Sequence, residues 1–323
     1  MQKYLEDLLA RLCDNSYIDL PDGSRTSEGS ISVLAHQEIA NFDKVEAIEP
    51  LKQLFLKSKN SWHRVYALRL LLKIAEKHDT QNIVSVVFDF LKSEKTNTVI
   101  YFTLDSMLDL EVSIYFDPFL EQLLGYLSSK DNATRHAAIR LLGKIKTHRA
   151  IVEDALLDFL SKTKNEYDLE YTANTLAKIG SKKSIEPLKN VLTTSKFVEV
   201  QRFSLYAIDA IDGKNQLNFY LSVADNFKAQ YTKETFSELI AAKNDARAIP
   251  YLTARLKYLL SKKRPDNTGY TEGTFPELVH IFKCFKQLSS KNEEINAIFD
   301  WIKNKKMNYL LFNELEWWNK NNL

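Results

Sequence analysis

The feature that most constrains the fold of this chain is an internal repeat. The segments 64–74 and 135–145 share an arginine, an alanine, a leucine and an isoleucine in one register. The same frame recurs around six anchor residues that lie 31 to 36 residues apart: Leu71, Met107, Leu142, Leu176, Ile208 and Leu239. A period of this length predicts a stack of similar supersecondary units, each burying its apolar face against its neighbours.

Each copy of the frame has the pattern of an amphipathic helix. The residues three positions before and three positions after the anchor are apolar in every copy. Apolar residues at spacings of three and four predict one buried face of an α-helix, whereas a strand would show alternation. The residue four positions before the anchor is small, which allows a neighbouring helix to approach closely: Ala67, Thr103, Ala138, Thr172, Ser204 and Thr235.

A second helix precedes this one in the repeat. Ile48, Ile185 and Ile249 each stand one or two residues before a proline. Proline is tolerated in the first turn of a helix, where its missing amide has no intrahelical acceptor to lose. Ile48 lies 23 residues before Leu71, and Ile185 lies 23 residues before Ile208. We therefore predict that each repeat is a pair of antiparallel helices, which we call A and B, joined by a short turn.

The composition agrees with a helical repeat. The 323 residues include 8 glycines and 7 prolines, roughly 2.5% and 2% of the chain against usual shares of about 7% and 5%. This scarcity excludes a sandwich, a barrel or a glycine-looped nucleotide fold, and a hydrophobic content of 45% excludes disorder. Gly180 and Gly213 follow predicted B helices, where we expect left-handed C-caps.

With A-I-x-P-L opening one helix and R-x-x-A-x-x-x-L-x-x-I on the next, the sequence resembles the HEAT-repeat superfamily, particularly its short lyase-type HEAT-like repeats. The resemblance covers residues 44–260 best and extends more weakly to Ile39 and Leu288; Ile100 replaces the arginine in one copy. It implies an all-α, right-handed α-solenoid of about eight antiparallel helix pairs. Folds of this kind mostly serve binding and host many unrelated functions.

Three segments depart from the repeat. We predict a single solenoid domain over residues 1–323, with inserted loops at 14–30 and 261–276 and an aromatic cap at 296–323. Long loops in compact repeats are often functional. The cap would cover the apolar edge that a solenoid end otherwise exposes.

The resemblance implies that the B helices line a concave face. Residues six before, two before and two after each anchor form a stripe opposite the buried face, and its charges run basic, acidic, basic and mixed. This is typical either of a solvated face with ion pairs between repeats or of a groove for a protein surface of mixed charge. Asp105 and Asp109 argue against a groove that follows nucleic-acid phosphates. With the second insertion, the predicted partner-binding residues are Arg69, Lys73, Tyr101, Asp105, Asp109, His136, Arg140, Lys144, Asn174, Lys178, Arg202, Tyr206, Lys262, Lys263, Arg264 and Tyr270.

The sequence contains no familiar catalytic motif. None of the six histidines is followed by glutamate, and H-E-x-x-H, G-x-S-x-G, G-x-G-x-x-G and the phosphate-loop motif do not occur. We expect no catalytic, cofactor or metal residues, and we predict a non-enzymatic protein-binding scaffold or adaptor. A chaperone or a toxin-neutralising protein would share this pattern. The alternative is a nucleic-acid-binding protein, or a lyase-like or glycosylase-like enzyme, on a HEAT-like scaffold.

Charge and cysteine content place few further limits. The 44 basic and 42 acidic residues leave a net charge of +2, which does not select a polyanionic partner. Cys13 and Cys284 have no metal-ligand spacing, which fits a reducing compartment. Glu6 and Asp7 interrupt the stretch where a signal peptide would be apolar, and the apolar runs are too short for a membrane span. We predict a cytoplasmic location, a protein partner and no membrane contact.

Overall fold

The computed structural model describes residues 1–78, 80–110, 116–264, 276–289, 292–321 and 323. Across these residues α-helices follow one another, and the only strands form a small hairpin. The prediction of an all-α fold is confirmed. None of the described helices has the length and apolar character needed to cross a membrane.

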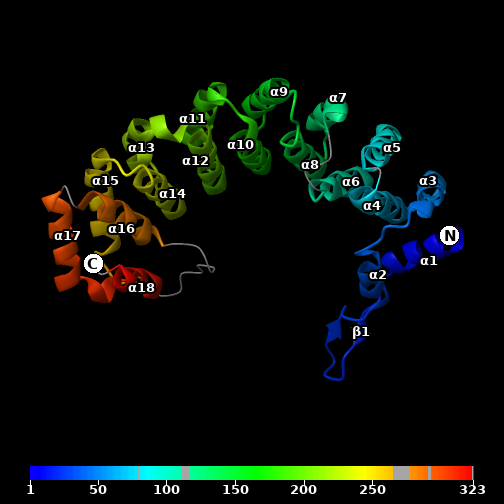
Figure 1. Ribbon diagram of the computed structural model, residues 1–323, viewed down its shortest axis with the longest axis horizontal. Coiled ribbons are helices and arrows are strands. Elements are labelled where there is room, and N and C mark those ends of the chain that lie inside the picture. The colour runs from blue at the N-terminus through cyan, green and yellow to red at the C-terminus, as the bar shows by residue number, and fades with distance from the viewer. Residues whose placement is uncertain (79, 111–115, 265–275, 290–291, 322) are drawn as a thin grey trace. The chain divides into compact units, whose positions relative to one another are not determined.

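The chain forms two compact units, Met1–Thr175 and Leu176–Leu323. In the N-terminal unit the A and B helices form two rows (Figure 1). After α1 (Gln2–Leu12) and α2 (Ile31–Ile39), the A helices are α3 (Ile48–Lys57), α5 (Thr80–Ser93), α7 (Leu120–Gly125) and α9 (Arg149–Lys162). The B helices are α4 (Ser61–Lys77), α6 (Asn97–Leu108), α8 (Asn132–Leu142) and α10 (Glu166–Ile179), which extends beyond the unit boundary.

The C-terminal unit continues the alternation of helices. Its A helices are α11 (Ile185–Thr194), α13 (Leu217–Val223), α15 (Ile249–Leu259) and α17 (Glu293–Lys305). The helices that follow them are α12 (Val198–Asp212), α14 (Gln230–Ala241), α16 (Glu277–Leu288) and α18 (Phe312–Lys320). Short 3-10 turns lie between several helices of both units, among them η3 (Tyr126–Ser128) before α8 and η6 (Ala224–Asn226) before α14.

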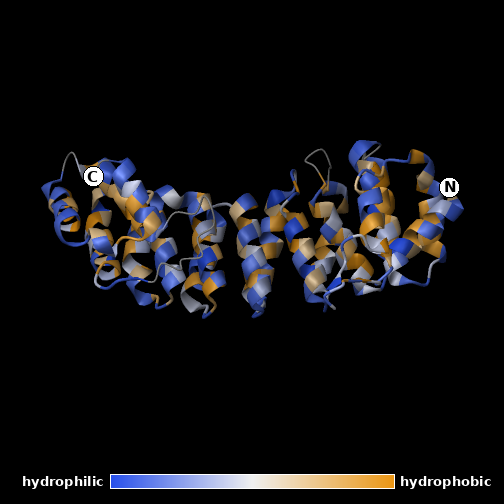
Figure 2. Cartoon of the chain, turned by 90° about the horizontal axis from the view of Figure 1, so that it is seen from below, coloured by the Kyte–Doolittle hydropathy of each residue, from blue (hydrophilic) through white to orange (hydrophobic). Residues whose placement is uncertain are grey.

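The predicted register of the B helices is confirmed. All six anchors and all six small residues are buried, with no anchor exposing more than 6% of its surface. Successive B helices pack directly on one another, as α4 does on α6 and α12 does on α14. Hydrophobic and hydrophilic residues alternate around the helices, as amphipathic helices require (Figure 2). Ala35 and Ile39 in α2 and Cys284 in α16 are also buried, so the pattern reaches the outer helices.

The proline positions also agree with the prediction. Pro50, Pro187 and Pro250 lie in the first turns of α3, α11 and α15. Each of these helices follows a 3-10 turn, namely η1 (Val45–Ala47), η4 (Lys182–Ser184) and η7 (Ala246–Ala248). The ring therefore occupies a position where no helical hydrogen bond is lost.

The expectation of left-handed caps at Gly180 and Gly213 is wrong. Among the described residues, the glycines with positive φ are Gly23 and Gly29, and Gly213 has a φ of −55°. Both positions require glycine because there is no room for a Cβ atom. A Cβ atom at Gly180 would lie 2.5 Å from the Leu176 carbonyl oxygen, and one at Gly213 would collide with the Asp209 carboxylate. The glycines permit close approach of the chain to itself.

The first insertion forms a small exposed hairpin. Strands β1 (Ile18–Asp19) and β2 (Arg25–Thr26) pair antiparallel, with Ile18 opposite Thr26. The turn between them includes Gly23, whose φ of 80° favours glycine. The insertion therefore departs from the helical repeat but buries little of its own surface.

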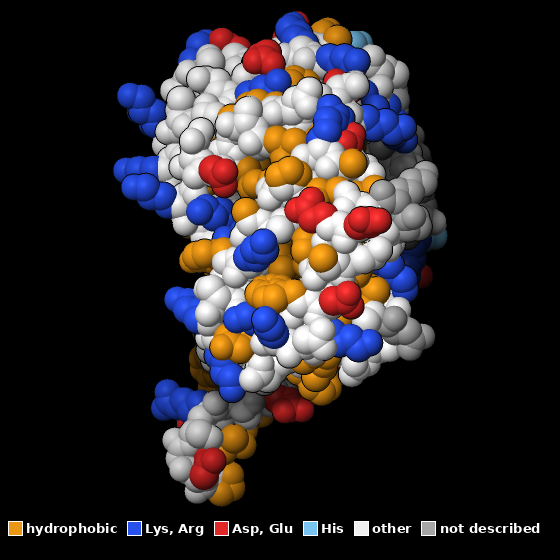
Figure 3. Space-filling view, turned by 90° about the vertical axis from the view of Figure 1, so that its left-hand side faces the viewer, with side chains coloured by type: hydrophobic (Ala, Val, Ile, Leu, Met, Phe, Trp, Pro, Cys, Tyr) orange, Lys and Arg blue, Asp and Glu red, His pale blue; other side chains and the backbone are white. Residues whose placement is uncertain are grey.

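The end of the C-terminal unit is closed by α18, which packs against α16. Trp318 is 2% exposed, and its ring lies 5.2 Å from that of Phe282 and 5.6 Å from that of Phe299. Arg264 forms an ion pair of 2.5 Å with the fully buried Glu314. On this end of the unit, hydrophobic side chains are interspersed with charged ones (Figure 3).

Candidate protein-binding surface

Most of the predicted partner-binding residues lie on the accessible side of the B helices. Arg69, Asp109, Arg140 and Lys178 are exposed. The half-buried members are Lys73, Tyr101, Asp105, His136, Lys144, Asn174, Arg202 and Tyr206. Of these, Arg69, Asp109, Asn174 and Lys178 make no side-chain hydrogen bond or ion pair within the described part of the chain.

Three other positions of the stripe are buried, which corrects the expectation that the whole stripe is accessible. Val65, Ser237 and Ala241 each expose 4% or less. Ser237 is covered because α14 packs against α16, where its hydroxyl donates a hydrogen bond of 2.6 Å to Glu277. The accessible side of a B helix therefore shifts with the helix that follows it.

Several stripe residues join one repeat to the next. Arg140 on α8 lies 3.2 Å from the Asp105 carboxylate on α6, and the two side chains are 44% and 39% exposed. Lys144 donates hydrogen bonds of 2.5 and 3.0 Å to the carbonyl oxygens of Leu108 and Leu110 at the end of α6. These contacts match the interpretation of the stripe as a face with ion pairs between repeats.

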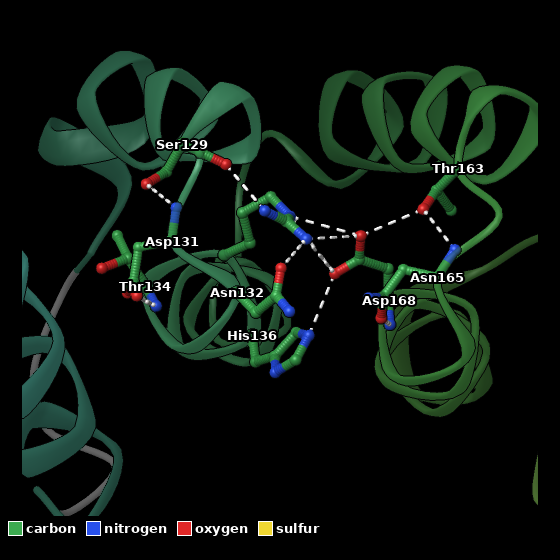
Figure 4. Close-up of polar contacts among 9 residues, drawn as sticks. Ser129, Asp131, Asn132, Thr134, His136, Thr163, Asn165 and Asp168 are labelled. Atoms are coloured by element: carbon green, nitrogen blue, oxygen red, sulfur yellow. Dashed lines mark hydrogen bonds and ion pairs between the residues drawn. The ribbon is translucent and has the colours of Figure 1, made fainter.

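A buried carboxylate joins α8 to α10. Asp168 is 2% exposed, and it accepts hydrogen bonds from Arg135 at 2.9 Å, His136 at 2.9 Å and Thr163 at 3.0 Å. Figure 4 shows His136 reaching this carboxylate from α8 and Thr163 reaching it from the turn between α9 and α10. The acid nearest to Arg135 in the sequence, Asp131, instead caps α8 by accepting the Thr134 amide at 2.8 Å.

The surroundings of Asp168 favour its charged form. Burial alone would raise the pKa of this carboxyl group, but the hydrogen bonds from His136, Arg135 and Thr163 outweigh burial and lower the pKa below its ordinary value. The carboxylate is fully engaged by these donors. The Asp168 and His136 pair therefore has the geometry of a structural joint between repeats.

The same joint recurs at the position seven residues before the anchor. Arg64 donates to the Ser58 carbonyl at 3.0 Å and to Glu94 of the next repeat at 2.9 Å. Arg135 uses the Ser129 carbonyl in the same way, at 2.8 Å. In the C-terminal unit, Gln201 donates to the Ser195 carbonyl at 2.7 Å and accepts from Thr232 at 2.7 Å. One side chain thus ties the turn before a B helix to the next repeat.

In the C-terminal unit the stripe residues are also engaged. Arg202 lies 3.0 Å from Glu199 and donates to the Thr235 hydroxyl at 3.3 Å. Tyr206 donates to Glu238 at 3.1 Å, and its burial raises the pKa of its hydroxyl. These side chains hold α12 against α14, so less of their polar surface is available to a partner.

The second predicted loop is only partly described. Lys262 and Lys263 are exposed. Arg264 instead turns inward to Glu314 and donates to the Tyr309 carbonyl at 3.3 Å. Tyr270 lies outside the described residues.

A cluster of aromatic side chains lies beside Arg69 and was missed from the sequence. The ring of Trp62 on α4, which is 41% exposed, lies 4.9 Å from that of Phe102 on α6 and 6.2 Å from that of Tyr66. The Tyr101 ring lies 4.8 Å from that of Phe102. We call Trp62, Tyr66, Arg69, Tyr101, Phe102 and Asp109 the α4/α6 face.

The sequence holds a signal for this cluster. Trp62 and Tyr66 stand nine and five residues before the anchor of α4, and Tyr167 and Tyr171 stand at the same positions of α10. Residues four apart share one side of a helix. The predicted stripe uses the positions six before, two before and two after each anchor, so it does not include these aromatic positions.

The electrostatic setting of the α4/α6 face is basic at one end. Burial and the nearby Arg69 both lower the pKa of His36, which lies 3.3 Å from the Tyr66 hydroxyl. Asp109 is exposed at the other end, after the last residue of α6. The face thus combines aromatic rings with one free cation and one free anion within the described part of the chain.

The described residues contain no cluster of histidine, cysteine, aspartate or glutamate that could hold a metal ion. No protein-family model and no curated protein matches this sequence.

Proposed function

We propose that this chain is a non-enzymatic scaffold that binds a partner protein through the α4/α6 face. An aromatic cluster beside Arg69 carries this proposal: Trp62 is exposed, and Tyr66, Tyr101 and Phe102 are half-buried. Tryptophan, tyrosine and arginine are the residues that most often dominate binding energy at protein interfaces. Rings that already contact one another lose little further freedom on binding.

The architecture that we propose for this scaffold is a right-handed HEAT-like solenoid of about eight helix pairs. The support is the repeat frame itself, because the anchors and small residues occupy equivalent buried positions in successive B helices. We also propose a cytoplasmic location. Cys13 and Cys284 are both free thiols, which suits a reducing compartment.

The test compares variants of the α4/α6 face in a binding titration. A partner is first identified by affinity purification from the native cell with mass spectrometry, and is then purified. We expect Arg69→Glu and Trp62→Ala each to weaken its binding by about thirtyfold, which corresponds to a loss of about 2 kcal/mol at a dominant interface residue. Circular dichroism should show unchanged helicity for Arg69→Glu, because Arg69 is exposed.

The matched control is Lys57→Glu, an equal charge reversal at an exposed position on the A helix α3. Its binding should stay within about twofold of the unmodified protein, as most interface-remote substitutions do. Equal affinity for the Arg69 and Trp62 variants and the unmodified protein would remove the α4/α6 face as the binding surface.

A further inference from the structure

One lysine stands at the centre of each of six consecutive turns that lead from an A helix into a B helix. Each of these turns between α3 and α14 is three residues long. We call their middle residues the turn lysines: Lys59, Lys95, Lys130, Lys164, Lys196 and Lys228. They fall eleven or twelve residues before the anchors, so the position belongs to the repeat.

The turn lysines are free to meet a ligand. All six are exposed, and none forms an ion pair within the part of the chain that the structure describes. The two acids next to them are used internally. Glu94 pairs with Arg64 at 2.9 Å, and Asp131 accepts the Thr134 amide at 2.8 Å.

In the N-terminal unit, Lys77 and Lys144 at the opposite ends of their B helices are held by the protein instead. Lys77 lies 3.8 Å from the Asp43 carboxylate, and Lys144 caps the end of α6. At a rise of 1.5 Å per residue, the 17 residues of α4 separate the two edges by about 25 Å. Unpaired positive charge therefore gathers on one edge of the N-terminal unit.

The joints between repeats set the spacing of this edge. Arg64 bonds both the turn that carries Lys59 and the turn that carries Lys95. Arg135 bonds the turn of Lys130 and, through Asp168, reaches the turn of Lys164. Neighbouring packed helices lie about 8–10 Å apart, so within each unit the turn lysines follow one another at steps of about 10 Å: Lys59, Lys95, Lys130 and Lys164 in the N-terminal unit, and Lys196 and Lys228 in the C-terminal unit.

In the C-terminal unit, two adjacent turn lysines lie beside a pocket. Lys196 and Lys228 line one pocket of about 400 Å³, together with Gln201, Asn226 and Phe227. None of the described residues that line this pocket is acidic. Two adjacent turn lysines therefore face a common space that an anionic group can enter.

We propose that the turn lysines bind the phosphate backbone of a nucleic acid without reading its sequence. A line of single positive charges at regular steps matches a linear chain of negative charges. The lysine ammonium is a compact point charge that binds phosphate without a fixed fork geometry. Neutralising phosphates releases counterions, which supplies most of the affinity of sequence-independent binding.

Two features favour this ligand over other anionic surfaces. Lysine is depleted in protein–protein interfaces, which makes a row of exposed lysines atypical of a protein contact. A membrane presents a plane of charge, whereas the turn lysines form a line only one residue wide on each turn. The argument that Asp105 and Asp109 repel phosphate concerns the B-helix stripe and does not apply to this edge.

The test measures fluorescence anisotropy of a labelled mixed-sequence DNA duplex titrated with the full chain at several salt concentrations between about 50 and 200 mM. We expect measurable binding at the lower salt, and a second duplex sequence should bind within about threefold. Replacing Lys95, Lys130 and Lys164 by glutamine should weaken binding at low salt by about tenfold or more. The slope of log affinity against log salt should fall by about 2.7, or 0.9 for each lost contact.

The matched control replaces Lys44, Lys77 and Lys146, on the opposite edge, by glutamine, which removes the same charge. It should retain binding within about threefold, and arginine at the three turn positions should restore it. Three results would overturn the proposal: no binding of the unmodified chain to duplex or single-stranded probes at low salt, an equal loss in the control, or lysine-dependent binding only to anionic vesicles or to an acidic protein. The α4/α6 variant Arg69→Glu should bind DNA normally, which separates this test from that of the proposed function.

Discussion

Arg135 and Asp168, 33 residues apart in the sequence, form a two-pronged contact in which Nε and Nη2 of the guanidinium each lie within 3.2 Å of the carboxylate. Their side chains are only 12% and 3% exposed. A nearly buried pair of this kind joins one repeat to the next, and its energetic weight can be measured.

Replacing Asp168 by asparagine should destabilise the protein by about 3 kcal/mol, because the Arg135 guanidinium would stay buried without its counter-ion. Urea denaturation followed by circular dichroism would show this as a lower midpoint. Asp105→Asn serves as the control, since its pair with Arg140 is exposed and should contribute less than about 1 kcal/mol. An equal loss of unfolding free energy in both variants would contradict the prediction that the buried pair contributes more to stability than the exposed one.

The lowered pKa of Asp168 predicts acid sensitivity. The ordinary pKa is 3.8, and the folded-state pKa lies below it. The unfolded chain therefore binds the proton more readily, so this stabilisation is complete above the ordinary pKa and is lost as the pH falls through it towards the folded-state pKa. Stability measured between about pH 5 and pH 3 should fall less steeply for Asp168→Asn than for the unmodified protein. Parallel pH profiles would refute this assignment.

Ser204 offers a stabilising substitution. Its hydroxyl is buried and has no hydrogen-bond partner among the described residues, and Ala67 and Ala138 fill the same position in other repeats. Ser204→Ala should raise the free energy of unfolding by up to about 1 kcal/mol, because an unpaired buried hydroxyl is costly. Thr235→Ala should lower it, since the Thr235 hydroxyl accepts from Arg202 and donates to the Tyr231 carbonyl. Thermal melts of both variants would show whether each substitution raises or lowers the stability of the protein.

Arg264→Met should loosen the end of the C-terminal unit. It would leave the fully buried Glu314 carboxylate without its cation, at a cost of about 3 kcal/mol. Hydrogen exchange in α18 should accelerate, because Glu314 also accepts the Leu311 amide at 2.8 Å at the start of that helix. Arg247→Met, which breaks an exposed pair with Asp245, should leave exchange in α18 unchanged. Unaltered exchange in the Arg264 variant would show that α18 is held by packing alone.

The sequence predicts the helices and their buried faces because helical periodicity and burial are local properties. Leu71 and Leu142 could be placed in the core from their neighbours three and four residues away. The partner of Arg135 could not be predicted in this way, because Asp168 belongs to another repeat. Its distance from Arg135 depends on the lateral spacing of the helices. A nearer acid, Asp131, is already engaged as a helix cap.

The accessible surface was predicted only in part for a similar reason. A stripe chosen on one helix ignores the tilt and cover that the next helix imposes, so Ser237 is buried while Trp62 is exposed. Hydrophobic periodicity does not predict the turn lysines, because they lie between helices. Their constant offset from the anchors is nevertheless visible in the sequence.

The interface between α6 and α8 differs from the α4/α6 and α8/α10 interfaces, where Arg64 and Arg135 form hydrogen bonds at the turns before the B helices. Ile100 occupies the register of Arg64 and Arg135 and has no polar group to donate, while Lys144 joins the two helices at their C-terminal ends. Among the described residues, the step between Lys95 and Lys130 therefore lacks an arginine that bonds both turns, as Arg64 and Arg135 do for the steps on either side, and we expect this step to change most when the row follows a curved polymer.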